Sequence, residues 1–81
     1  KTNYSLHSSS SSKHEERKRI GSQIKALRTF KGFKAKYFAT LINIDPGSLS
    51  RIEKGDRSVG LDMLSLIADH LDAKVELVSK G

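Results

Sequence analysis

The stretch NIDPGSLSRIEKG, residues 43–55, constrains the fold of this 81-residue chain most, because it defines both ends of one short helix. Asp45 is a preferred residue at a helix N-cap, and Pro46 suits the first helical position, where its missing N–H costs nothing. Gly55 suits the left-handed position that ends a helix. Asn43 tolerates the same conformation, which a sharp turn requires. The sequence therefore predicts a tight turn followed by a short helix.

Three further helices are predicted from apolar residues that recur at helical spacing. Ser12 and Glu15 can form a capping box at the start of the first of them, and Gly32 can end it. The three predicted helices cover roughly residues 13–31, 35–42 and 61–71. We expect one folded unit over residues 13–72, because a chain of this length has too little apolar surface for a second core.

The two ends of the chain have different patterns. Residues 1–12 include a five-serine run and little apolar surface, so we predict a disordered tail. Residues 73–81 begin with alternating apolar and polar side chains, which predicts a short β-strand. Because the chain offers no second strand, we expect this one to pair across a homodimer, through Val75, Leu77 and Val78. A frayed helix end is the alternative.

The charge is distributed unevenly along the sequence. The formal net charge is +6, and residues 13–36 contain nine Lys or Arg against two Glu. From residue 56 onward, five acidic side chains stand against three basic ones. A basic half on a small domain favours binding to nucleic acid, and an ordinary solvated helix face is the alternative.

Several function classes are disfavoured by what the sequence lacks. It has no cysteine, which excludes disulfides and thiolate metal sites. No apolar run approaches the about 20 residues that span a bilayer, so we expect no membrane association. The histidines have no metal-like partners at suitable spacing, and no nucleophile–base pattern or phosphate-binding glycine loop is present. We therefore predict no cofactor, no metal and no enzymatic activity.

Several short motifs together resemble one known family. The segments IKALR, FKAKYFATLINI, SLSRIEKG and LDMLSLIADHL, which span residues 24–71, are similar to the Cro and lambda-repressor (XRE) family of helix-turn-helix domains. The resemblance implies an all-α, lambda-repressor-like domain of four to five helices. It also implies that Arg28 and Glu53 form a structural ion pair between the first and third helices.

Two departures from the family pattern affect DNA recognition. Lys34 stands where the family often has a Thr or Ser cap, and Pro46 and Gly47 occupy positions that usually hold base-reading side chains. We therefore expect specificity to depend on Arg51, whose guanidinium suits guanine O6 and N7, with backbone contacts and DNA shape in addition. A phosphate contact alone is the alternative for Arg51. The predicted DNA-binding residues are Lys34, Lys36, Pro46, Gly47, Ser48, Ser50, Arg51, Lys54 and Arg57.

The resemblance implies a cytoplasmic, nucleoid-bound transcription regulator, a homodimer that represses from a palindromic operator in double-stranded DNA. The predicted C-terminal strand is similar to that of antitoxins of toxin–antitoxin operons, which implies autorepression and a kinase-like toxin as a partner. A protein-interaction adaptor with weak or no specific DNA binding is the alternative.

Overall fold

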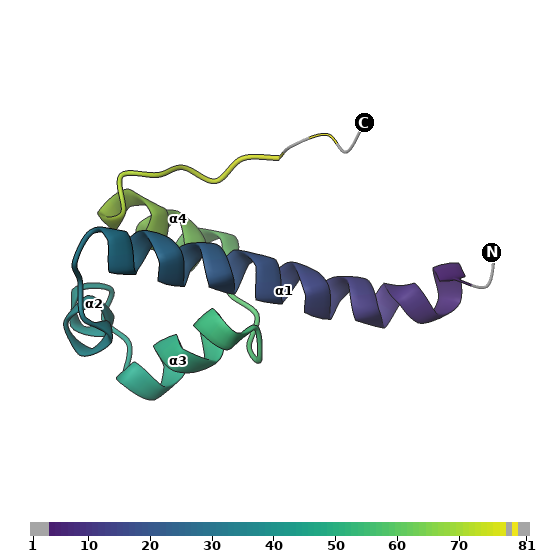
Figure 1. The fold of residues 1–81 in the computed structure, drawn as a ribbon, viewed down its shortest axis with the longest axis horizontal. Coiled ribbons are helices and arrows are strands. Elements are labelled where there is room, and N and C mark those ends of the chain that lie inside the picture. The colour runs from purple at the N-terminus through teal and green to yellow at the C-terminus, as the bar shows by residue number, and fades with distance from the viewer. Residues whose placement is uncertain (1–3, 78, 80–81) are drawn as a thin grey trace.

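The computed structural model describes the backbone of residues 4–77 and 79, and the side chains of residues 13–77 and 79. This part of the chain contains four α-helices and no strand (Figure 1). The helices are α1 Tyr4–Phe30, α2 Ala35–Leu41, α3 Pro46–Lys54 and α4 Leu61–His70. The predicted all-α fold is confirmed over these residues, with four helices.

The start of α1 differs from the sequence-based expectation. The helix begins at Tyr4, although we predicted a disordered tail over residues 1–12 and a helix start near Ser12. Adding a residue to an existing helix costs far less than nucleating a new one, and neither glycine nor proline interrupts residues 4–12. The N-terminal half of α1 extends beyond the other three helices (Figure 1).

A tight turn joins α2 to α3, as the sequence predicts. Asn43 lies in the turn with a positive φ of 62°, and the backbone N–H of Ile44 donates to the Ala39 carbonyl at 3.0 Å. At the end of α3, Gly55 has the left-handed conformation, with a φ of 81°. These two residues give α3 a definite direction relative to α2 and a definite length.

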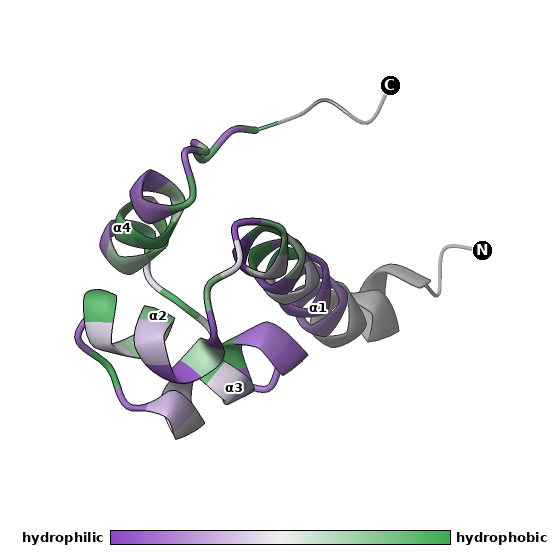
Figure 2. Ribbon diagram, turned by 60° about the vertical axis from the view of Figure 1, so that its left-hand side comes forward, coloured by the Kyte–Doolittle hydropathy of each residue, from purple (hydrophilic) through white to green (hydrophobic). Residues whose placement is uncertain are grey.

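The core lies between the four helices. Its largest fully buried side chains are Phe38, Ile42, Leu49 and Ile67, which come from α2, its C-cap, α3 and α4. Ile24 of α1 belongs to the same cluster, which also includes Ala39, Ile52 and Leu71. Figure 2 shows α4 above α2 and α3, with α1 beside them. Burial of each such side chain stabilises the fold by roughly 1.5–3 kcal/mol, so the core holds the α2–α3 pair rigidly.

The backbones of α1 and α3 approach each other closely at Gly21. A Cβ atom added there would lie 2.4 Å from the carbonyl oxygen of Ile52 and 2.6 Å from that of Glu53. Only glycine fits this position, because both neighbouring atoms belong to the backbone. The close approach lets α1 support the inner side of α3 along its C-terminal half.

The C-terminal segment contradicts one prediction. Residues 73–77 follow α4 as a coil and form no β-strand (Figure 1). The prediction was wrong because alternating side chains create only the potential for a strand, and the backbone groups of a strand need a pairing partner. The described part of this chain is otherwise helical and offers none. Val75 and Leu77 are exposed, and Val78 lies outside the described residues.

Among the helices of the described residues, none has the length and apolar character that crossing a bilayer requires.

Candidate nucleic-acid interface

One face of α3 is exposed along the whole helix. Five residues, at positions that differ by one or three along the sequence, are exposed to solvent: Pro46, Gly47, Ser50, Arg51 and Lys54. Leu49 and Ile52 are buried on the opposite face, as their helical spacing requires. The structure therefore brings together five of the nine residues that the sequence predicts for DNA binding.

Ser48 is an exception among the predicted DNA-binding residues. Only 7% of its surface is exposed, and its polar groups are used within the protein. The Ser48 hydroxyl donates to Asp45 Oδ1 at 2.8 Å, and its backbone N–H donates to Asp45 Oδ2 at 3.0 Å. Arg57 Nη1 donates in turn to the Ser48 hydroxyl oxygen at 2.8 Å. Ser48 thus links the cap of α3 to the loop before α4.

The Asp45 cap is charged at neutral pH. Hydrogen bonds from the Ser48 hydroxyl and from the Ser48 backbone N–H lower the pKa of the Asp45 carboxyl below its usual value. The positive charge of Arg51 lowers this pKa as well. A capping carboxylate stabilises the start of a helix by satisfying free N–H groups and by interacting favourably with the helix dipole.

The head of Arg51 lies near Gly47, at the start of α3. A Cβ atom added to Gly47 would lie 3.7 Å from Arg51 Nη1 and 3.0 Å from Asp45 Oδ2. The Arg51 side chain therefore runs back along α3 from its own position toward the N-terminal end. The guanidinium of Arg51 therefore lies at the Pro46–Gly47 end of α3, although Arg51 itself is one helical turn further along.

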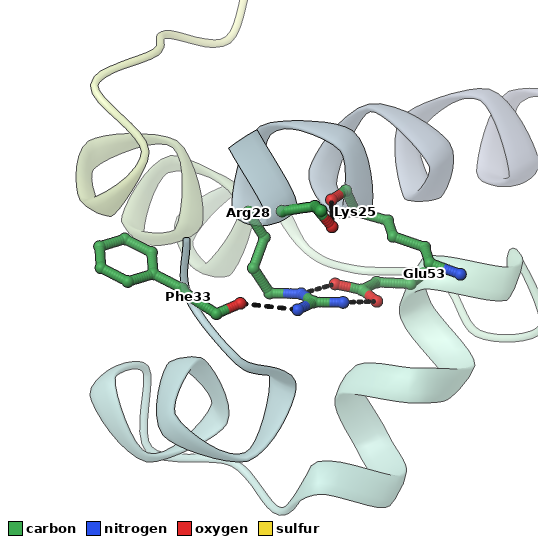
Figure 3. Close-up of polar contacts among 5 residues, drawn as sticks. Lys25, Arg28, Phe33 and Glu53 are labelled. Atoms are coloured by element: carbon green, nitrogen blue, oxygen red, sulfur yellow. Dashed lines mark hydrogen bonds and ion pairs between the residues drawn. The ribbon is translucent and has the colours of Figure 1, made fainter. Parts of the chain in front are cut away.

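A buried ion pair joins α1 to α3 (Figure 3). Arg28 Nε donates to Glu53 Oε2 at 2.7 Å, and Arg28 Nη2 donates to Glu53 Oε1 at 3.0 Å. Arg28 Nη1 also donates to the Phe33 carbonyl at 2.8 Å, so the guanidinium holds three elements together. The hydrogen bonds to Glu53 raise the pKa of Arg28, which remains cationic. This pair is the one that the family resemblance implies.

The predicted residues of α2 stand near its start. Lys34 is the N-cap of α2 and makes no side-chain capping hydrogen bond, and both Lys34 and Lys36 are exposed. Figures 1 and 2 show that α2 and α3 lie together on one side of α1, away from α4. Their lysines therefore belong to the same half of the molecule as the exposed face of α3.

Sequence reasoning missed three residues of α1 that contact the C-terminal end of α3. Besides Gly21, Arg17 Nε donates to the Gly55 carbonyl at 3.2 Å, and Lys18 lies against the same glycine. These contacts join α1 to the C-terminal end of α3, where a positive charge interacts favourably with the helix dipole. A glycine inside a helical pattern was the available signal, because it often marks a close helix contact.

A model of the helix-turn-helix family matches residues 24–78 of this sequence, which is more than half of the chain. The chain belongs to the helix-turn-helix family. The family match includes all of α2, α3 and α4, together with the part of α1 that carries Arg28. It confirms the resemblance to XRE-type domains inferred from the sequence.

Solved structures support the same assignment. The clp gene regulator ClgR from Corynebacterium glutamicum is 28% identical to this helix-turn-helix chain, with a TM-score of 0.69 over 72% of this chain and 62% of that chain. A second ClgR structure gives 29% identity, a TM-score of 0.70 and coverage of 73% and 76%. The first match thus spans less than two thirds of the ClgR chain.

The restriction-modification controller protein C.AhdI from Aeromonas hydrophila is also similar, with 28% identity and a TM-score of 0.70 over 75% of this chain and 88% of that chain. The comparison with curated proteins gives no match.

Proposed function

We propose that this chain is a DNA-binding transcription regulator that inserts α3 into the major groove. The observation that carries the proposal is the exposed face of α3, which presents Ser50, Arg51 and Lys54 on a helix held from behind by a buried ion pair. A rigid helix with polar and basic groups on its outer side fits the major groove. The names of the solved neighbours, a gene regulator and a controller protein, support a regulatory role.

Within this face, Arg51 is the proposed base-reading residue. Its guanidinium can donate two parallel hydrogen bonds to guanine O6 and N7, which distinguishes this base from the others. Because Pro46 and Gly47 have small side chains, the tip of α3 can approach the base edges closely. Ser50 is one turn along the exposed face from Gly47 and can add one further hydrogen bond.

The surrounding basic residues are the proposed phosphate contacts. Lys34 and Lys36 begin α2, Lys54 ends α3, and Arg57 follows in the loop before α4. Each phosphate neutralised by such a side chain releases condensed counterions, which provides affinity that falls as salt rises. Phosphate contacts fix the register of the protein on the duplex, whereas base contacts select the sequence.

We also propose a homodimer on a palindromic operator, with two α3 helices in major grooves about 34–36 Å apart. The contact would involve the segment 73–77, in which Val75 and Leu77 expose 42% and 99% of their surface. Sedimentation should show a dimer for the unmodified chain and a monomer for Val75→Asp.

Binding of such a dimer near a promoter would repress transcription, and the proposal includes repression of its own gene on the bacterial nucleoid. The antitoxin role inferred from the sequence depended on a C-terminal strand. Because residues 73–77 form no strand, that role loses its main support, and a toxin partner is not part of this proposal.

The proposal is tested by fluorescence anisotropy with the DNA upstream of the gene and a scrambled duplex of the same composition, each at low and high salt. We expect tighter binding to the upstream duplex and a preference that persists at high salt. Equal binding to both duplexes that is lost at high salt would reject sequence-specific regulation from this DNA. Absence of binding to either duplex would favour the adaptor function instead.

A further inference from the structure

The Asp45 carboxylate and the Arg51 guanidinium both lie near the bare backbone of Gly47. Both Asp45 Oδ2 and Arg51 Nη1 lie close to the position that a Cβ atom of Gly47 would occupy, at 3.0 Å and 3.7 Å. The carboxylate cannot turn away freely, because each of its oxygens accepts a hydrogen bond from Ser48. A fixed negative charge therefore stands beside the guanidinium at the exposed tip of α3.

We propose that Asp45 is a positioning residue whose charge attracts Arg51 toward the tip of α3 and favours base contacts over phosphate contacts. This inference depends on the proposed DNA-binding function and adds a determinant of its specificity. Besides capping α3, Asp45 would then affect DNA recognition by acting on Arg51.

The physical basis is the difference between what attracts a guanidinium to phosphate and to guanine. Attraction to phosphate depends mainly on net charge, and a neighbouring carboxylate offsets much of that charge. Recognition of guanine depends on the direction of the N–H donors. A guanidinium has five such donors, so one neighbouring carboxylate leaves others available.

The geometry also explains why a residue without a side chain suits position 47. A side chain there would lie near both Asp45 and Arg51, and its Cβ alone would be 3.0 Å from the carboxylate oxygen. Gly47 is therefore favoured less by backbone conformation, since its φ is not in the left-handed region, than by the space beside the Asp45 carboxylate.

The test is the substitution Asp45→Asn, which removes the charge and keeps a residue that caps helices well. The probes are the duplex that the unmodified protein enriches most from a randomised library and a scrambled version of it. We expect binding to the scrambled duplex to strengthen and its salt dependence to steepen by about one phosphate contact. The preference for the enriched duplex should fall by roughly fivefold, within the range of one base contact.

A second background shows whether Asp45 acts through Arg51. In Arg51→Ala, the additional Asp45→Asn substitution should leave the preference and the salt dependence unchanged. An equal gain in both backgrounds would overturn the inference, because Asp45 would then repel DNA by itself. No change in either background would also overturn it and leave Asp45 as a cap alone.

Two controls complete the design. Asp62→Asn removes the same charge from α4 and should leave the preference for the enriched duplex unchanged, and thermal melting checks that each variant is folded. If the unmodified protein enriches no sequence, the proposed function itself fails. If it enriches a sequence and Asp45→Asn retains the full preference, only this inference fails.

Discussion

The two faces of α3 differ in how many of their groups are already used within the protein. On the inner face, Leu49 and Ile52 are buried, Glu53 is paired with Arg28, and the backbone touches α1 at Gly21. On the outer face, Pro46, Gly47, Ser50, Arg51 and Lys54 are exposed to solvent. The inner face therefore determines where the helix lies, and the outer face remains available for an external partner.

The same comparison separates two kinds of experiment. Substitutions on the inner face should reduce the free energy of unfolding, because they remove packing or leave a buried charge without its partner. Substitutions on the outer face should change DNA binding and leave the free energy of unfolding almost unchanged. A variant that violates this division would reveal a residue whose role is misassigned.

The largest effect is expected for Arg28→Ala. It leaves the Glu53 carboxylate buried and unpaired, so the free energy of unfolding should fall by about 3–5 kcal/mol in urea denaturation. Arg19→Ala is the matched control, since it breaks an exposed ion pair with Glu16 within α1 and should have little effect. Similar losses for the two variants would contradict the assignment of Arg28 to a buried ion pair that links α1 to α3.

The next largest loss in the free energy of unfolding is expected for Gly21→Ala. Its Cβ would overlap backbone atoms of α3, which must then move, and we expect a loss of about 3 kcal/mol in the same measurement. Ser22→Ala, at the exposed neighbouring position, should stabilise α1 slightly because alanine has the higher helix propensity. A neutral Gly21→Ala variant would mean that α1 and α3 are less tightly packed than the structure indicates.

An outer-face prediction concerns the charge and shape of residue 51. Arg51→Lys keeps the positive charge but loses the planar pair of donors, so it should lose the preference for the upstream duplex and retain the salt dependence. Arg51→Ala should lose this preference as well, with a loss of about 1–3 kcal/mol on the preferred sequence only. Equal weakening of all sequences by Arg51→Ala, measured by anisotropy, would assign Arg51 to phosphate contact.

The smallest effect is a pH dependence at the start of α3. Because the pKa of Asp45 is lower in the folded chain, its contribution to stability is present above the unfolded pKa and is lost as the pH falls through the folded value. The melting temperature of the unmodified protein should therefore fall under acid conditions, and Asp45→Asn should show a smaller fall.

Asp72, whose pKa is lowered by a hydrogen bond and the charge of Lys31, retains its own acid dependence in both proteins. An identical fall for the unmodified protein and Asp45→Asn would contradict the role of Asp45 in that dependence.

Local chemistry made the α2–α3 unit predictable. Asp45 accepts from the Ser48 N–H, Pro46 begins the helix, and Asn43 and Gly55 have the positive φ angles that their positions require. Each of these preferences acts over a few residues, so the sequence contains the whole signal. The ion pair between α1 and α3 came from the family resemblance, because nothing local connects residues 28 and 53.

Other features could not be predicted because they depend on distant partners. Ser48 was expected on the DNA-binding face, but it is buried and hydrogen-bonded to Asp45 and to Arg57, which reaches it from the loop after α3. Residues 73–77 would form a strand only if another segment paired with them, and the pattern of apolar residues does not show whether such a segment exists. The turn of Arg51 back toward Gly47 was not predicted either.

The most direct test of the central claim is an NMR titration of the labelled protein with the preferred duplex, read as backbone amide shifts. We predict that the largest shifts occur at the outer face of α3, at the start of α2 and at Arg57, while α4 changes little. Largest shifts in α4 and residues 73–77, with an unchanged α3, would contradict the assignment of α3 as the DNA-binding helix.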